Sequence, residues 1–390
     1  MGRMADPNEA RQTGRLIFLL GLGALASALA SRVLDPMVGV LAEEFSASTA
    51  TVALLTTAFA LPYALVQPVL GPLGDAIGKM RVIRVALLAL ALALMLGALA
   101  PDLASLGALR MLAGAAAGGI FPLALAMVGD RVPLERRQVA LSRLLVAGLT
   151  GGAGGGALSA LLAPWIGWRG VLLVCATVAV IAWVAMREPG PPPPGRRFHA
   201  TEALARYRHI LALPAARVLY GAVFLEGMLV FGVFPFLAPI LAMRGLGGAP
   251  EAGVAVVAYA LGGFAFAGLA ALMLRRFGQA RMVRLGGLCC AAGLAGVALA
   301  PAAWLLIGAC LLLGLGFYMM HTSIQTRVTE VAPMARGSAV ALHAFSFFLG
   351  QAIGPVVLGA GSAVLGLALA LLCMAGGVVA LGWWLGRPGR

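Results

Sequence analysis

Charged residues are scarce in this chain. They make up 11% of its 390 residues, whereas 62% are hydrophobic, and the mean hydropathy is +1.00. In soluble globular proteins, about a quarter of the residues are charged. So few charges cannot cover a surface that faces water, which excludes an ordinary soluble domain. We therefore expect lipid to surround most of the chain, and we predict an all-α membrane protein.

Acidic residues are rarer than basic ones. The chain has 14 aspartates and glutamates against 28 lysines and arginines, which gives a net charge of +14. A nucleic-acid partner would need these basic residues on one surface. Instead, all but four lie in the N-terminal segment, the C-terminal segment and every second connection between apolar runs; the exceptions are Arg32, Arg110, Arg169 and Arg244. This is the positive-inside pattern. It predicts a multi-pass protein of the cell (inner) membrane with both termini cytoplasmic, and no nucleic-acid partner.

Motifs for enzyme chemistry are also missing from the sequence. It holds no P-loop, no HExxH and no CxxC, and its five cysteines all lie in apolar runs. We therefore predict that the protein is not an enzyme and binds no metal or cofactor. A receptor would need a large soluble domain for signalling, and the longest polar stretch, residues 187–217, is too short to form one.

Long apolar runs make up most of the sequence. Runs of about 18 residues or more indicate transmembrane helices. Twelve can be counted, at 16–41, 50–71, 82–100, 104–129, 141–163, 169–187, 218–243, 252–274, 283–301, 303–327, 338–361 and 363–386. Their richness in alanine, leucine and glycine favours helices packed through small residues over the alternating strands of a barrel. We predict twelve transmembrane helices.

The second half of the sequence repeats the first. The polar stretch divides the chain into an N-terminal six-helix half (1–187), a cytoplasmic linker (188–217) and a C-terminal six-helix half (218–390). Identical residues recur at a spacing of 200, namely Gly78 with Gly278, Arg81 with Arg281, Arg84 with Arg284 and Pro101 with Pro301. Parallel repeats of this kind build a large class of secondary transporters. We expect two pseudo-symmetric halves in a monomer.

The stretch GPLGDAIGKMR at 71–81 carries a family resemblance. It resembles the loop motif G-x-L-x-D-R-x-G-R/K-R/K of the major facilitator superfamily, although Ala76 stands where the family has arginine. The gating motif consists of Gly71, Asp75, Gly78, Lys79 and Arg81. The resemblance implies the major facilitator fold. It also implies that Asp75 contacts the start of the helix near residue 338 and holds the outward-open state. The alternative is a plain turn that carries positive-inside charge.

A few charged side chains lie well inside apolar runs, where burial is costly, and we take these residues as candidates for function. They are Arg32 and Asp35 in the first run, Arg110 in the fourth and Glu226 in the seventh. Asp35 and Arg110 lie at matching depth, so we predict that they pair, with Arg32 competing for the same carboxylate. Glu226 has no basic neighbour in its own run, so it could bind a proton, recognise a cation or bond to a backbone carbonyl. We predict proton coupling through these four residues; a permanently paired structural cluster is the alternative.

Two further motifs resemble those of drug–proton antiporters in the twelve-helix branch of the superfamily. LGALRMLAGAAAG contains Arg110 in the pattern L-x-x-x-R-x-x-Q-G-x-G, with Ala113 in place of glutamine; the family associates this arginine with proton transfer. The run 141–163 resembles G-x-x-x-G-P-x-x-G-G-x-L, with Ala147 and Gly152 replacing the first glycine and the proline. We expect these glycine-rich faces to pack closely against the other half. The residues are Gly151, Gly155 and Gly156, with Gly354 and Pro355 in the run 338–361.

These features together predict a proton-coupled secondary active transporter that exports small molecules, as a drug or multidrug efflux antiporter working by alternating access. Its partners would be the substrate, protons and the lipid bilayer, with the proton gradient as energy source. Efflux or uptake of a sugar or other small metabolite is the alternative. An apolar substrate cavity is predicted from aromatic, methionine and polar residues of several runs, namely Phe59, Tyr63, Phe121, Met228, Phe231, Phe234, Tyr318 and Gln351.

Overall fold

The computed structural model describes residues 7–132, 134–187, 200–332 and 335–387, and every regular element in these ranges is helical. The first half contains α1 (Pro7–Arg32), the 3-10 turn η1 (Asp35–Met37), α2 (Val38–Glu44), α3 (Thr49–Ile77), α4 (Lys79–Gly97), α5 (Leu103–Ala117), α6 (Ile120–Arg131) and α7 (Leu134–Ala185). The second half contains α8 (Ala200–Ala212), α9 (Pro214–Phe231), the 3-10 turn η2 (Phe234–Phe236), α10 (Leu237–Met243), α11 (Ala249–Leu299), α12 (Ala303–Val331), α13 (Arg336–Leu365) and α14 (Leu367–Leu385).

Ten helical runs in the described part are long and apolar enough to cross a membrane. Two of them, Val139–Ala185 and Ala249–Leu299, have 47 and 51 residues, whereas one crossing needs only about 20. Each contains a glycine with a left-handed backbone, Gly167 with φ 67° and Gly278 with φ 69°. Glycine adopts this conformation without steric cost, so each long helix bends back there and crosses twice. The described chain therefore makes the twelve predicted passes, and the all-α membrane fold is confirmed.

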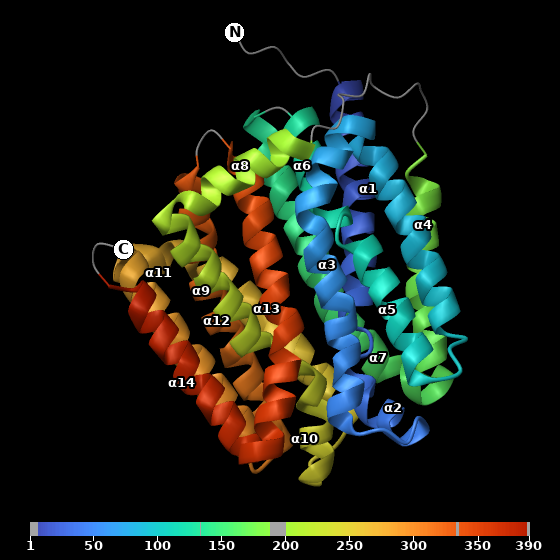
Figure 1. The fold of residues 1–390 in the computed structure, drawn as a ribbon, viewed down its shortest axis with the longest axis vertical. Coiled ribbons are helices and arrows are strands. Elements are labelled where there is room, and N and C mark those ends of the chain that lie inside the picture. The colour runs from blue at the N-terminus through green and yellow to red at the C-terminus, as the bar shows by residue number, and fades with distance from the viewer. Residues whose placement is uncertain (1–6, 133, 188–199, 333–334, 388–390) are drawn as a thin grey trace.

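The backbone repeats as the sequence does. The first pass is interrupted by η1 at Pro36, and the seventh pass is interrupted by η2 at Pro235. Proline has no N–H to donate, so it breaks the helix at both places. Buried apolar residues form two large clusters, one within residues 17–186 and one within residues 210–385 together with Ala53. Figure 1 shows the corresponding bundles side by side, blue to green and yellow to red.

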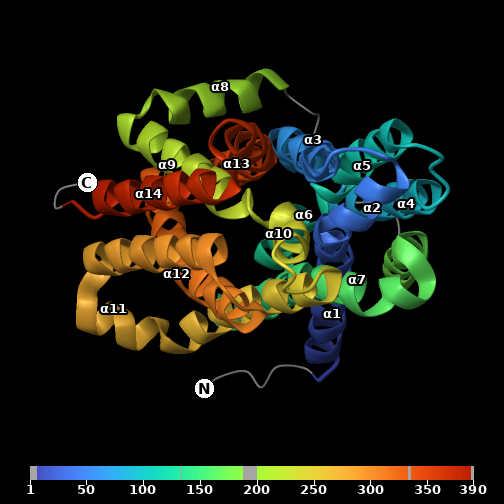
Figure 2. The same ribbon diagram turned by 90° about the horizontal axis from the view of Figure 1, so that it is seen from below.

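The two bundles meet along α3 with α13 and along α7 with α11, and Figure 2 shows α13 beside α3. We call the end of the bundle with α8 and the start of α1 the terminal face, and the end with α2 and α10 the opposite face (Figure 1). The contacts between bundles include the Thr57 hydroxyl, which donates to the Ala352 carbonyl at 2.6 Å, and the rings of Tyr63 and Phe348, 4.2 Å apart. Because α3 starts at Thr49 on the opposite face, these contacts close the seam from mid-depth towards that face.

Part of the range predicted as a linker is helical. Residues 188–199 lie outside the described residues, whereas α8 and the start of α9 fall between 200 and 217. The hydroxyl of Tyr207 on α8 donates to the carbonyl oxygen of Pro68 on α3 at 2.8 Å. This bond ties the connection between the halves to the second pass.

Candidate functional site

Asp35 occupies the break in the first pass and is almost fully buried, with 1% of its surface exposed. Its Oδ2 lies 3.0 Å from Nη1 of Arg32, and its Oδ1 accepts a 2.7 Å hydrogen bond from the Thr56 hydroxyl on α3. A buried carboxylate is tolerated when both of its oxygens have partners of this kind. The pairing of residues 32 and 35 follows the three-residue spacing of a helix.

Arg32 also connects the two halves. Its Nη2 donates to Oε1 of Gln351 on α13 at 2.9 Å. The guanidinium carbon lies 4.7 Å from the ring centre of Phe231 and 4.9 Å from that of Phe234, both in the second half. Aromatic faces stabilise cations at such distances. A cation of the first half is thus held by an aromatic pair and an amide of the second, deep in the seam.

The predicted ion pair between Asp35 and Arg110 is wrong: in the part of the chain that the structure describes, Arg110 pairs with no carboxylate. Its Nη1 donates to the Ala30 carbonyl at 2.8 Å and its Nη2 to the Ser31 carbonyl at 3.4 Å, and its guanidinium carbon lies 4.4 Å from the ring centre of Phe59. The physical reason is the end of α1 at Arg32, since the last carbonyls of a helix lack backbone partners and carry partial negative charge. Arg110 satisfies them.

Glu226 forms a second buried site, and its partner lies on another helix. Its side chain is 0% exposed, and Oε2 lies 2.8 Å from Nδ1 of His321 on α12. The His321 ring stacks on Phe317 with centroids 4.8 Å apart and lies 5.1 Å from the ring of His343 on α13. Within the described residues, Oε1 of Glu226 and Nε2 of His343 have no hydrogen-bond partner. A search of the seventh run alone could not reveal this pairing.

The aromatic residues that were predicted to line one cavity lie in several separate parts of the structure. Phe231 and Phe234 lie in one cluster with Tyr259 and Phe317, and Phe347 joins it from α13. Tyr318 packs against this cluster, with its ring 5.0 Å from that of Phe317. Tyr63 meets Phe348 across the seam, and the ring of Phe59 lies 5.9 Å from that of Tyr63. Phe121 instead packs on the core of the first half, and Met228 lies where α9 crosses α13. Tyr259, Phe317, Phe347 and Phe348 are the residues that the sequence reasoning missed.

The sequence matches the family model of the Major Facilitator Superfamily over residues 20–355, most of the chain. The chain belongs to the Major Facilitator Superfamily. It is a multi-pass membrane transporter, and the relatives and structural neighbours described below are transporters or resistance proteins of this kind.

Two curated relatives and one solved structure illustrate the similarity. An uncharacterised MFS-type transporter of Bacillus subtilis, YwfA, is 25% identical over 376 residues, which cover 94% of this chain and 91% of the relative. A chloramphenicol resistance protein of Streptomyces lividans is 28% identical over 261 residues, 64% of each chain. The crystal structure of a bacterial homologue of the human lysosomal transporter Spinster, inward-facing and unoccupied, superposes with a TM-score of 0.73 over 98% of both chains at 19% identity. The last similarity shows the fold alone.

The superfamily's loop motif spans the end of α3, Gly78 and the start of α4. Gly78 takes a φ of 98° that glycine adopts easily, which allows the chain to end α3 and begin α4 at once. Nζ of Lys79 lies 2.8 Å from Oδ2 of Asp130 at the end of α6, a partner that the sequence did not suggest. Arg81 is exposed. Gly71 and Asp75 fall outside the residues whose side-chain surroundings the structure describes, and so does the predicted contact of Asp75 with the start of α13.

The glycine-rich faces of this superfamily member pack mainly within each half, which corrects the expected packing against the other half. Added side chains at Gly151 and Gly155 on α7 would collide with the carbonyls of Leu25 and Leu29 on α1. Gly354, next to Pro355 on α13, likewise abuts Gly232 beside α9. Of the four predicted glycines, Gly156 faces the other half, where a Cβ would come within 2.9 Å of Val256 on α11. The repeated fold explains this, because passes 5 and 11 occupy equivalent places beside passes 1 and 7.

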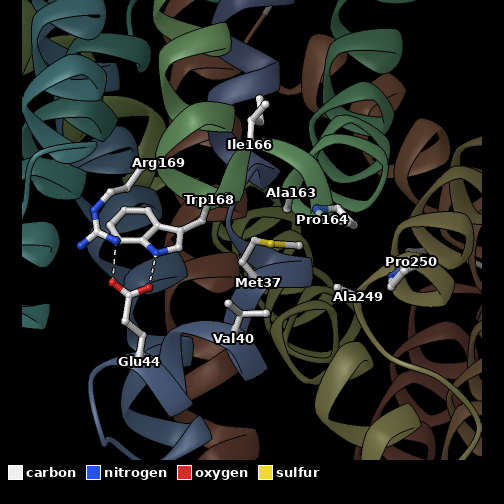
Figure 3. A pocket seen from close by; sticks show the side chains of 11 residues that line it. Met37, Val40, Glu44, Ala163, Pro164, Ile166, Trp168, Arg169, Ala249 and Pro250 are labelled. Atoms are coloured by element: carbon white, nitrogen blue, oxygen red, sulfur yellow. Dashed lines mark hydrogen bonds and ion pairs between the residues drawn. The ribbon is translucent and has the colours of Figure 1, made fainter.

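A cavity of about 540 Å³ opens at the opposite face between α7 and the start of α11 (Figure 3). Its first-half side includes Met37, Val40 and Glu44, and Ala249 and Pro250 line it from the second half. The carboxylate of Glu44 accepts hydrogen bonds from Nε1 of Trp168 at 2.7 Å and from Nη1 of Arg169 at 2.5 Å (Figure 3). These bonds fix the end of α2 to the bend at Gly167.

Proposed function

We propose that this transporter exports small molecules in exchange for protons, as a drug or multidrug efflux antiporter working by alternating access. The similarity to the chloramphenicol resistance protein supports export of drugs. Rocking of two repeated halves about a central site is the mechanism that such a fold favours. No cofactor would be needed, since the proton gradient supplies the energy.

The proposal rests on the chain of hydrogen bonds that links Asp35, Arg32 and Gln351. Arg32 is shared between a carboxylate of its own half and an amide of the other. When Asp35 binds a proton, Arg32 loses its only ionic partner among the described residues. A buried cation without a counter-ion is costly, so the seam should open to let water reach it. The proton would in this way be coupled to the relative position of the halves.

Glu226 is the second proposed proton carrier. Nδ1 of His321 contacts its Oε2, and the ring of His343 lies 5.1 Å from that of His321. A hydrogen bond of 2.8 Å between a carboxyl oxygen and an imidazole nitrogen requires one proton between them. Release of that proton would break this hydrogen bond and leave both oxygens of a buried carboxylate without a donor, since Oε1 has no partner among the described residues. Proton exchange with water on one face would therefore change the energy of the site. Arg110, held by the end of α1, would act as a fixed positive charge beside Asp35.

We also propose the arrangement of the chain in the cell. Both termini and α8 would lie in the cytoplasm, on the inner side of the cell membrane, because nearly all basic residues gather there. The two separate core clusters support a division into halves at 1–187 and 218–390 with a cytoplasmic linker at 188–217, although the second cluster already includes Ile210 and Ala216 of the linker range. A monomer would suffice, since the proposed site lies between the halves of one chain.

Proton release from inside-out vesicles tests the proposal. Respiration acidifies the lumen, and a panel of drugs, lipophilic cations, sugars and other metabolites is added in turn. We expect at least one compound to release lumenal protons, and the release to be lost in Asp35→Asn and Glu226→Gln. Asp102→Asn and Glu202→Gln, which change exposed carboxylates of the same kinds, serve as matched controls. If every compound fails to release protons while folded protein is present, exchange for protons is refuted and the metabolite or uptake alternatives take its place.

A further inference from the structure

The charges at the seam do not balance. Arg32 lies at the seam, and Arg110, whose contacts are all in the first half, lies close enough to interact electrostatically with Asp35. Both are cations, and among the described residues Asp35 is the one carboxylate bonded to either of them. Arg110 is hydrogen-bonded to two neutral backbone carbonyls and lies over a phenyl ring, and the carboxylate whose charge acts on it, Asp35, is already bonded to Arg32. Arginine keeps its charge even when buried. The cluster therefore carries one net positive charge at a depth where an unbalanced charge is costly.

The pair formed by Glu226 and His321 does not cancel this charge. Its buried Oε1 lacks a partner, so a full negative charge on Glu226 would be poorly stabilised. The pair is most stable as a neutral unit, either as a carboxylic acid with imidazole or as a carboxylate with imidazolium. In both forms it adds no net charge to the seam.

Two further groups that can donate a hydrogen bond are buried without a partner among the described residues. The hydroxyl of Tyr259 is buried without a partner among the described residues, and its ring lies 4.9 Å from Phe234, one of the two rings beneath Arg32. Nε of Arg110 is likewise without an acceptor. Unpaired buried donors beside an unbalanced cation are suited to a ligand that supplies acceptors and a negative charge.

Arg32 is the group that such a ligand can reach. Its side chain is 11% exposed, whereas Asp35 is 1% exposed. One of its two partners, Gln351, offers only a neutral amide oxygen. A carboxylate would form a stronger, charge-assisted bond with Nη2 than that amide. By displacing Gln351, it would also break the bond that joins the two halves at this point.

We propose that the transported substrates are hydrophobic organic anions, bound through a carboxylate at Arg32 in place of Gln351, with an apolar body against Phe231 and Phe234. This inference rests on the proposed transport function and narrows its substrate class. Lipophilic cations would be repelled by the same two arginines. The bound carboxylate would restore neutrality to the seam while releasing the contact between α1 and α13, so binding would favour movement of the halves.

Equilibrium binding to the purified full-length protein in detergent tests the substrate class. Benzoate, benzamide and benzylammonium share one ring and differ in charge, so comparison of the three isolates the effect of the anion. Titration calorimetry at neutral pH should show benzoate binding at least about tenfold more tightly than benzamide, the advantage expected of a charge-assisted bond. Benzylammonium should bind more weakly than benzamide.

Two variants locate the site. Gln351→Glu keeps the size and shape of the side chain and places a competing carboxylate beside Arg32, so it should remove the preference for benzoate over benzamide. Arg32→Gln should do the same by removing the cation, and Glu202→Gln on exposed α8 is the control that should keep it. Equal binding of benzoate and benzamide, tighter binding of benzylammonium, absence of benzoate binding to the folded protein, or a preference unchanged in Gln351→Glu would each overturn the proposal.

This experiment is independent of proton coupling, because it uses no gradient and no vesicle. A protein that binds benzoate selectively but releases no protons refutes proton exchange only. A protein that releases protons with neutral or cationic drugs, and shows no preference for benzoate, refutes the anion only.

Discussion

Nη2 of Arg32 lies 2.9 Å from Oε1 of Gln351, so one hydrogen bond joins the last residue of α1 in the first half to the middle of α13 in the second. The other terminal nitrogen of the same guanidinium contacts Asp35. The side chain of Arg32 therefore contacts both a titratable group, Asp35, and a residue of the other half, Gln351. A change at Asp35 should alter the contact with Gln351, and a change at Gln351 should alter the surroundings of Asp35.

Gln351→Leu should loosen the seam. It removes the acceptor and leaves a buried guanidinium donor unpaired, and hydrogen bonds to charged groups contribute about 1.5–3 kcal/mol. That amount shifts an equilibrium by about tenfold or more. Ala53, a residue of the first half within the core cluster of the second, reports on the seam when replaced by cysteine in a Cys373→Ser background. Maleimide should modify this cysteine at least about tenfold faster when Gln351→Leu is present.

The control for this change is Gln67→Leu. Gln67 is also buried, but its Nε2 donates to the Gly118 carbonyl within the same half. The Gln67→Leu substitution should leave the rate of maleimide modification at position 53 nearly unchanged. A similar increase in both variants would contradict a specific role for the bond between Arg32 and Gln351.

Gly155→Val should destabilise the first half. An added side chain at this position meets the Leu29 carbonyl of α1, whereas Gly152 on the same helix has nothing within 4 Å of an added Cβ. Overpacking of this kind costs about 1–3 kcal/mol. The free energy of unfolding in mixed micelles should fall by this amount for Gly155→Val and much less for the matched Gly152→Val. Equal losses would show that valine itself, rather than the close approach of α7 to α1, is responsible.

Glu226 and His321 should be energetically coupled. His321→Gln removes the ring nitrogen that contacts the buried carboxyl group, and an unsatisfied buried group costs about 1–3 kcal/mol. A double-mutant cycle with Glu226→Gln, measured by unfolding in mixed micelles, should give an interaction energy of about 0.5–3 kcal/mol. Effects that simply add, to within about 0.3–0.5 kcal/mol, would mean that the two side chains do not stabilise one another.

Asp102 should give a pH-dependent contribution to stability outside the membrane. It caps the start of α5, and hydrogen bonds from the backbone N–H and the side chain of Ser105 lower the pKa of its carboxyl group from the ordinary value of 3.8. The stabilisation is therefore fully present above that ordinary pKa and is lost as the pH falls through the lowered one. The difference in melting temperature between wild type and Asp102→Ala should shrink as the pH falls from 3.8 through the lowered pKa. A difference that stays the same below the lowered pKa would show that the Asp102 carboxylate is not its cause.

The fold was predictable from the sequence because its signals are local. Long apolar runs fix the passes, and the repeated glycines at 78 and 278 both take left-handed backbones in the structure. The contact between Arg32 and Asp35 was also predictable, since it follows from helical spacing. Each of these depends on residues a few positions apart or on a simple repeat.

The rest of the site depends on contacts between distant segments. His321 lies 95 positions from Glu226, and a search of one apolar run could not pair them. The partners of Arg110 are backbone carbonyls, which every residue has. These two carbonyls lack a helical hydrogen-bond partner because α1 ends at Arg32. The glycines of α7 marked close packing correctly, but whether the facing helix belonged to the same half could not be read from their spacing.

The proton on Asp35 should control closure of the seam, and distances between spin labels test this most directly. Leu99 and Trp304 lie near the opposite face in the first and second halves and are 75% and 71% exposed, so cysteines at these positions in a Cys373→Ser background can carry nitroxides. On lowering the pH, the distance distribution of wild type should shift to longer values, whereas Asp35→Asn should show the longer distances at every pH. Distances that do not respond to pH, or that respond equally in Asp35→Asn, would contradict the account.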